Sequence, residues 1–162
     1  MDTHNEAADF TVRPAEEHDL PRLAEFEAEI ARISFAEDAI DDLEVQQKKL
    51  AKAMAKSPDG MFVACRGGEP ASGWLWITVN TNPMSGQRYA NFRSLAVAPI
   101  PERSEVGELL LATGLDFVDL HGVTEVVGKV HASNTAMRTL YRKFGFTATH
   151  LTMKLDRRER AE

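Results

Sequence analysis

Apolar residues recur with two different periods along this chain, and each period predicts a different kind of element. From Asp19 they return every three or four positions, which is the spacing of an amphipathic helix. Three further helices are predicted, at 38–56, 104–120 and 135–144. Short apolar or alternating runs bounded by Gly, Pro and Asn predict strands at 10–13, 61–65, 74–79, 89–97, 126–130 and 146–155.

The order of these elements predicts the fold class. The three strands between 61 and 97 are joined by short turns, which is typical of an antiparallel meander. Helices and strands then alternate, so we expect an α/β (α+β) fold with a mixed, mostly antiparallel central sheet flanked by helices. Residues 10–155 are expected to form a single domain, between a flexible leader at 1–9 and a charged tail at 156–162.

Size and composition favour one soluble globular domain. The chain has 162 residues, of which 43% are hydrophobic and 27% charged. Its start lacks the pattern of a secretory signal, and no apolar run approaches the roughly 20 residues of a membrane span. The single cysteine, Cys65, excludes an internal disulfide and fits a reducing cytoplasm. We expect a cytoplasmic protein without a membrane partner, in which Cys65 is a core residue.

The charge of the chain is unevenly distributed. Its net charge is −6, but the first 60 residues hold 7 Lys/Arg against 15 Asp/Glu, and the remainder hold 12 against 10. No basic stripe is visible, so a nucleic-acid partner is not expected. The acidic first part has two interpretations, a solvated surface or a field that steers a cationic substrate. The five histidines show no ligand spacing, and no metal is expected.

The segment from Val126 to Phe146 carries the most chemical information. It predicts a strand, a polar cap, a short helix and a turn into a further strand. Asn134 and Tyr141 lie at the two ends of the helix, where one elongated cofactor could contact both. Asn134 alone could be an ordinary N-cap, and Tyr141 alone could be a core residue of an amphipathic helix.

This arrangement resembles the GNAT N-acetyltransferase superfamily. The resemblance covers Phe10 to about Leu155, and its most specific parts are Ser94–Pro99 (SLAVAP) and Asn134–Phe146 (NTAMRTLYRKFGF). It implies acetyl-CoA as co-substrate, with its pantetheine arm between two strands that splay apart, one ending at Val97 and the other near Val130.

The resemblance also implies roles for individual residues. Backbone groups of Leu95, Ala96 and Val97 would pair with the pantetheine, and an N–H there would polarise the thioester carbonyl. The pyrophosphate would lie on N–H groups at the start of a helix. Asn134 would contact CoA, and Tyr141 would face the sulfur and protonate the departing thiolate. The residues of the implied phosphate site are Arg103, Ser104, Val106, Gly107 and Glu108.

Three positions depart from the family pattern. The family's phosphate loop, Q/R-x-x-G-x-G/A, aligns here with Glu102 at the basic position and Glu105 at the first glycine, and only Gly107 is kept. Where many members have a glutamate base, this chain has Asn91, which cannot accept a proton. His131 follows the strand that would border the acetyl site and is a candidate base; a strand-end histidine without that role is the alternative.

We therefore expect an N-acetyltransferase that acts on a primary amine of a small molecule or peptide by direct attack. The acceptor pocket would be formed by residues 26–35, Trp74, Trp76 and 80–89, although the two tryptophans could equally be core. Family members are often dimers, so a homodimer is one option. The alternative function is a GNAT-fold protein with weakened or lost CoA binding that acts as a non-catalytic binding or regulatory module. A third is transfer from a different acyl-CoA.

Overall fold

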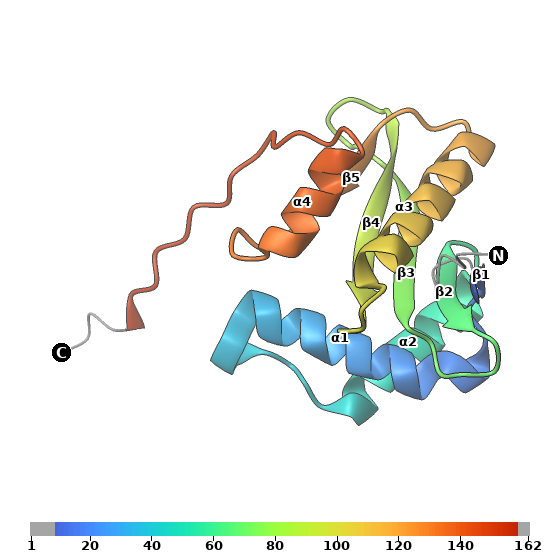
Figure 1. Cartoon of the computed structure of the whole chain (residues 1–162). Coiled ribbons are helices and arrows are strands. Elements are labelled where there is room, and N and C mark those ends of the chain that lie inside the picture. Colours follow the sequence, from blue (N-terminus) through green and yellow to red (C-terminus); the bar gives the residue numbers. More distant parts are fainter. Residues whose placement is uncertain (1–8, 159–162) are drawn as a thin grey trace.

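A five-stranded sheet with helices on both faces forms the body of the molecule (Figure 1). The computed structural model describes residues 9–158. Within this part of the chain, no helix is long and apolar enough to cross a membrane. In chain order the strands and α-helices are β1 (Phe10–Pro14), α1 (Leu20–Phe35), α2 (Leu43–Lys56), β2 (Met61–Arg66), β3 (Gly73–Thr81), β4 (Arg88–Val97), α3 (Arg103–Leu120), β5 (Val126–Gly128) and α4 (Thr135–Lys143).

The strands lie side by side in the order in which they occur in the chain. β1 to β4 pair antiparallel, and β5 lies parallel to β4. The predicted meander and the predicted mixed, mostly antiparallel sheet are therefore confirmed. The parallel pair is short, because it joins only Ala90–Phe92 to Val126–Gly128.

Alternating side chains of β3 supply two separate cores. Trp74 and Trp76 point to one face, where they pack with residues of α1 and α2 such as Leu23 and Leu50. Leu75 and Ile77 point to the other face and pack with α3. This period of two follows from the pleat of a strand. Figure 1 shows α1 and α2 away from α3 and α4, with the strands between the two pairs.

The second helix begins later than the sequence predicted. Residues 36–38 form a 3-10 turn, and α2 starts at Leu43 instead of 38. Asp42 caps it, because its side chain accepts hydrogen bonds from the N–H groups of Glu44 and Val45 at 2.9 and 3.2 Å. Ile40, which lies within the predicted helix at 38–56, is 62% exposed.

The strand predicted at 146–155 is absent from the described residues, and β5 ends at Gly128 instead of Val130. Phe146 still packs on Tyr141, with ring centroids 4.8 Å apart. Beyond it the chain runs away from the sheet without a pairing partner (Figure 1), and all three of its large apolar side chains are exposed. The alternating pattern reports only a preference for extended backbone, whereas a strand also needs a neighbouring edge. The exposed residues are Leu151, Met153 and Leu155.

The two predicted end segments lie partly outside the described residues. Of the leader at 1–9 the structure describes only Asp9, and of the tail at 156–162 only 156–158. In the tail, the Arg158 guanidinium donates to both carboxylate oxygens of Asp38, at 3.1 and 3.0 Å. The described end of the tail is therefore tied to the turn that follows α1.

Candidate functional site

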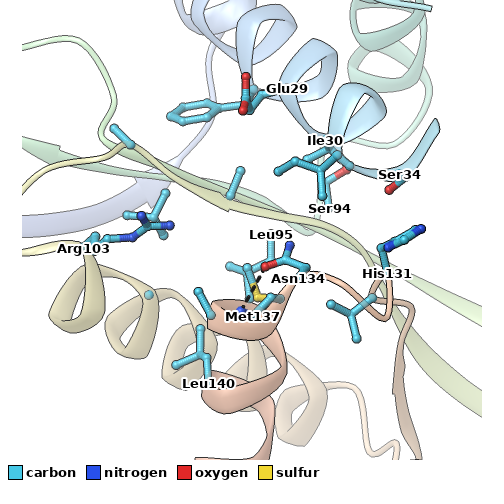
Figure 2. A pocket seen from close by; sticks show the side chains of 18 of the residues that line it. Glu29, Ile30, Ser34, Ser94, Leu95, Arg103, His131, Asn134, Met137 and Leu140 are labelled. Atoms are coloured by element: carbon cyan, nitrogen blue, oxygen red, sulfur yellow. Dashed lines mark hydrogen bonds between the residues drawn. The ribbon is translucent and has the colours of Figure 1, made fainter. Parts of the chain in front are cut away.

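A cavity of about 990 Å³ opens between α1, the end of β4, the first turns of α3, and α4 (Figure 2). Its volume is at the upper end of the range of small-molecule and cofactor sites. Figure 2 shows Ser94 and Ile30 toward the α1 side of β4, and Leu95, Asn134 and Met137 toward the α4 side. The cavity therefore continues from one face of β4 to the other.

The end of β4 provides this passage because it has no β5 neighbour. The β4–β5 register ends at Phe92 opposite Gly128, while β4 continues to Val97. Residues 93–97 all line the cavity, including the predicted Leu95, Ala96 and Val97. Their other edge is held by β3, so the open edge offers main-chain groups in strand geometry to a ligand.

The first turns of α3 form a second wall of the cavity. Four residues of the predicted phosphate site line it, namely Arg103, Ser104, Gly107 and Glu108. The N-cap residue of α3, Glu102, makes no side-chain cap hydrogen bond to this helix end. The N-terminus of an 18-residue helix favours an anion, and Arg103 adds a positive side chain at the same place.

The two glutamates that depart from the family pattern do not line the cavity. The Glu102 carboxylate is turned to β2, where Oε1 lies 3.6 Å from Nη1 of Arg66. Glu105 is exposed on a different face of α3. Their charges therefore affect an anion in the cavity less than their sequence positions suggested.

Val106 is the predicted phosphate-site residue that the structure does not bring to the cavity. Its side chain is fully buried in the core under α3, and its N–H already donates to the Glu102 carbonyl at 3.0 Å. Gly107, in contrast, lines the cavity and also gives room to α4. A Cβ on Gly107 would lie 3.1 Å from Leu140 Cδ2, so the missing side chain allows the two helices to approach.

Asn134 is the N-cap of α4. Its Oδ1 accepts a hydrogen bond from the Met137 N–H at 3.2 Å, and its side chain also lines the cavity (Figure 2). Because Oδ1 serves the cap, the amide Nδ2 is the group that Asn134 can offer to a ligand. Capping and ligand contact are therefore compatible in this geometry.

Tyr141 lines the cavity from α4, although its side chain is only 7% exposed. The phenol packs against Gly128 of β5 and against the ring of Phe146. Burial raises the pKa of the Tyr141 phenol well above its usual value near 10. The phenol therefore stays in its neutral form at every physiological pH, with an O–H group that can donate a hydrogen bond.

His131 also lines the cavity, but its ring is already engaged. Nδ1 accepts a hydrogen bond from the Ser133 N–H at 3.1 Å and lies 2.7 Å from Ser133 Oγ. A neutral imidazole that accepts at Nδ1 carries its proton on Nε2. To act as a base, His131 would have to give up its contacts with Ser133.

The wall on the α1 side contains both charged and apolar residues. Glu29 and Arg32 form an ion pair at 2.8 Å, and Arg22 and Glu25 form another at 2.6 Å. Ile30, Ile33 and Phe26 also line the cavity from α1. Of the predicted acceptor pocket, six residues within 26–35 line the cavity, whereas none at 80–89 does.

Neither tryptophan reaches the cavity. Trp74 is fully buried and Trp76 is 5% exposed, so both are core residues. Arg93 lies over the Trp76 ring, 4.1 Å from its centroid, and lines the cavity. Asn91 pairs with Val127 across the parallel ladder and does not line the cavity.

One buried polar pair beside the cavity, Glu27 with Ser94, was not among the predicted site residues. The Glu27 side chain is 7% exposed, and its Oε2 accepts a hydrogen bond from Ser94 Oγ at 2.7 Å. A signal was present, because Glu27 follows Leu23 by four residues and so falls on the apolar stripe of α1. A carboxylate at such a position is seldom buried without a partner.

The fold and the cavity define an α/β protein whose cavity lies at the unpaired end of β4, between α1, the first turns of α3, and α4. The family model described as the Acetyltransferase (GNAT) family matches residues 20–146. The chain therefore belongs to the GNAT acetyltransferase family, as the sequence resemblance indicated.

Several known proteins are similar to the chain in sequence or in structure. A mycothiol acetyltransferase from Renibacterium salmoninarum is 25% identical over 87 residues, which are 54% of this chain but only 26% of that protein. A transcriptional regulator from Bacillus halodurans has a TM-score of 0.71 at 18% identity, covering 91% of this chain and 99% of its own. An aminoglycoside acetyltransferase from an uncultured soil metagenomic sample, solved with sisomicin, has a TM-score of 0.64 at 21% identity, covering 92% and 95%. At these identities the structural likeness concerns the fold.

Across residues 9–158, no three His, Cys, Asp or Glu side chains are grouped so that they could hold a metal ion. Cys65 is buried, and burial raises the pKa of its thiol. This thiol therefore stays protonated and is a poor ligand or nucleophile.

Proposed function

We propose that this protein transfers an acetyl group from acetyl-CoA to a primary amine of a small molecule or peptide by direct attack. The observation that carries the proposal is the open edge of β4 at residues 93–97, which lines the cavity together with Tyr141 on α4. A strand edge of this kind fits the amide groups of a pantetheine arm, and family membership supports the same ligand.

The residues that would hold acetyl-CoA fit its chemistry. Main-chain groups of Leu95 and Val97 would pair with the pantetheine, and the first turn of α3 with Arg103 would bind the pyrophosphate. The Nδ2 group of Asn134 would donate to the same arm. Glu102 and Glu105, whose places in the phosphate loop suggested weakened CoA binding, are turned away from the cavity.

When bound, acetyl-CoA supplies an activated acyl group and a thiolate leaving group. The protein itself would polarise the thioester carbonyl and protonate the leaving thiolate. An N–H of the open β4 edge would donate to the carbonyl oxygen, where negative charge develops. Tyr141, which burial keeps neutral, would give its proton to the departing sulfur.

The acceptor would approach from the α1 side of the cavity. Glu29 and Asp41 line this part and could attract a cationic amine, although Arg32 pairs with both, at 2.8 and 3.8 Å. The similar aminoglycoside acetyltransferase, solved with sisomicin, supports a small molecule as the acceptor. His131, at the rim of the cavity, is one candidate for the base.

Calorimetric titration of the protein with acetyl-CoA and with free CoA tests the proposal. Binding in the micromolar range is expected, followed by release of free thiol when a panel of primary amines is added. Absence of binding to either compound would overturn the proposal in favour of a non-catalytic binding module. Binding without thiol release from acetyl-CoA, but with release from a longer acyl-CoA, would identify a different acyl donor.

A further inference from the structure

We infer that Ser94 and Glu27 form a proton relay that deprotonates the acceptor amine, with Ser94 in contact with the amine and Glu27 as the final proton acceptor. The inference rests on the proposed transferase function. It concerns the missing base, because the position at which many family members carry a glutamate is Asn91 here.

Glu27 is an ionisable group buried beside the apolar cluster between α1, α2 and the sheet. Its carboxylate lies between α1, α2 and the sheet, beside Trp74 and close to Ser94. Oε2 accepts from Trp74 Nε1 at 3.2 Å as well as from Ser94 Oγ, and Oε1 lies 3.7 Å from Lys49 Nζ. A buried ion pair is seldom a net gain in stability over apolar residues, so stability alone is a weak reason for a charge here.

Ser94 connects this carboxylate to the cavity. The Ser94 side chain lines the cavity on the α1 side of β4, near Ile30 (Figure 2). Since a carboxylate has no proton to give, the Ser94 hydroxyl must be the donor in the 2.7 Å bond to Glu27. Its oxygen lone pairs therefore remain to accept a proton from a group in the cavity.

Ser94 also lies next to the reacting centre expected for acetyl transfer. It directly precedes Leu95 in β4, and successive side chains of a strand point to opposite faces. The open main-chain edge of β4 runs between these two faces, so an amine beside Ser94 Oγ would be adjacent to an acyl group held on that edge. His131 lies across the cavity, with its Nδ1 engaged by Ser133.

The relay balances as follows. An acceptor amine arrives as an ammonium ion, and one N–H bond breaks as its proton passes to Ser94 Oγ. The original Ser94 proton passes to Glu27, which becomes a neutral carboxylic acid. The neutral amine then forms the C–N bond, the C–S bond breaks, and the electron pair leaves on sulfur. Sulfur takes the Tyr141 proton, Tyr141 is reprotonated by the proton that leaves nitrogen, and Glu27 returns its proton to solvent.

The test compares Glu27→Gln, Ser94→Ala and the double variant in a thiol-release assay with acetyl-CoA and the best amine of the panel. Ser94→Ala leaves the Glu27 contacts with Trp74 and Lys49 in place, so it separates the relay from the packing role of Glu27. We expect kcat to fall by about 10²-fold or more in each single variant, with little change in KM for acetyl-CoA. The double variant should be no slower than the slower single variant, because both residues act in one path.

Three controls make the outcomes distinct. Glu44→Gln, which removes an exposed carboxylate on α2 that pairs with Lys48, should leave kcat unchanged. Calorimetric affinity for acetyl-CoA should be the same in all variants. If Ser94→Ala keeps the wild-type kcat, the relay is wrong while the transferase function stands. The same holds if His131→Gln lowers kcat and neither Ser94→Ala nor Glu27→Gln does. If the wild-type protein binds no CoA compound or acetylates no amine, the proposed function fails and the relay fails with it.

Discussion

Gly128 and Tyr141 touch so closely that the absence of a side chain on one residue determines the position of the other. A Cβ built on Gly128 would lie 2.7 Å from the Tyr141 hydroxyl oxygen and 2.8 Å from Cζ. The contact joins the last paired residue of β5 to the helix that carries the phenol. The end of the short parallel ladder thus fixes the depth at which Tyr141 enters the cavity.

Gly128→Ala should displace the Tyr141 ring, because overlap at such distances is relieved only by movement of the phenol or of β5. We expect a loss of about 1–3 kcal/mol in the free energy of unfolding, as for other overpacked contacts. Acetyl transfer should fall at the same time. Urea unfolding and the thiol-release assay measure the two effects. Gly68→Ala is the matched control, since a Cβ there meets nothing within 4 Å; equal behaviour of the two variants would contradict the prediction.

Tyr141→Phe should lower turnover more than affinity. The substitution removes only the hydroxyl, so the ring contact with Phe146 and the packing against Gly128 are kept. If the phenol protonates the leaving thiolate, kcat should fall by about 10²-fold, with KM for acetyl-CoA nearly unchanged. Steady-state kinetics with the best amine measures this. A kcat equal to that of the wild-type protein would remove Tyr141 from the mechanism.

Burial of the Tyr141 phenol predicts that the protein loses stability at alkaline pH. The pKa of Tyr141 is raised in the folded protein, whereas in the unfolded chain it is about 10. Above about pH 10, the unfolded state loses the phenolic proton and the folded state keeps it, so the free energy of unfolding falls as pH rises. Below that pH both states keep the proton, and Tyr141 does not contribute to the pH dependence of stability. The wild-type protein should therefore lose more stability than Tyr141→Phe between pH 8 and pH 11. Parallel urea titrations at the two pH values would show equal losses if the phenol were solvated.

Arg103→Ala should weaken binding of acetyl-CoA about tenfold or more, because Arg103 lines the cavity at the positive end of α3. Glu105→Gln should change the affinity by less than about twofold, since its exposed carboxylate lies outside the cavity and is screened by solvent. Calorimetry at two salt concentrations checks both variants. A large gain in affinity for Glu105→Gln would mean that the loop brings this charge to the phosphates after all.

Asp19 should make the fold sensitive to acid. Burial alone would raise the pKa of its carboxyl, but hydrogen bonds from Arg13 and from the Glu16 N–H, with the charge of Arg13, outweigh burial and lower it. The stability from this group is complete above the unfolded-state pKa near 4 and is lost as pH falls toward the folded value. Asp19→Asn should be less stable than the wild-type protein at pH 7, by about 1–3 kcal/mol. The difference should shrink between pH 5 and pH 3 in urea titrations; a constant difference would exclude the ionised carboxylate as its source.

Much of the fold followed from local patterns. The period of two in β3 and the period near 3.6 in α1 and α3 predicted these elements because each reports which face of one segment is buried. The same patterns failed at 146–155 and at the start of α2. In the first case the extended segment has no strand beside it, and in the second the cap at Asp42 sets the helix start.

The candidate site was predictable to the extent that it lies in contiguous motifs. Leu95 to Val97, Asn134 and Tyr141 belong to the two short family segments, Arg103 and Gly107 belong to the aligned phosphate loop, and all of them line the cavity. Glu27 and Ser94 were missed because they are 67 residues apart and no motif joins them. Only the packing of α1 across β4 brings a carboxylate and a hydroxyl to 2.7 Å.

The sequence by itself determined the family, the antiparallel meander between 61 and 97, and the helix that carries Asn134 and Tyr141, since these depend on local periodicity and on contiguous residues. The tertiary structure decided which charges face the cavity. It turned Glu102 toward Arg66, left Glu105 in solvent and buried Glu27 beside Ser94. Side-chain direction is fixed by packing against distant segments, and a linear spacing carries no information about those neighbours.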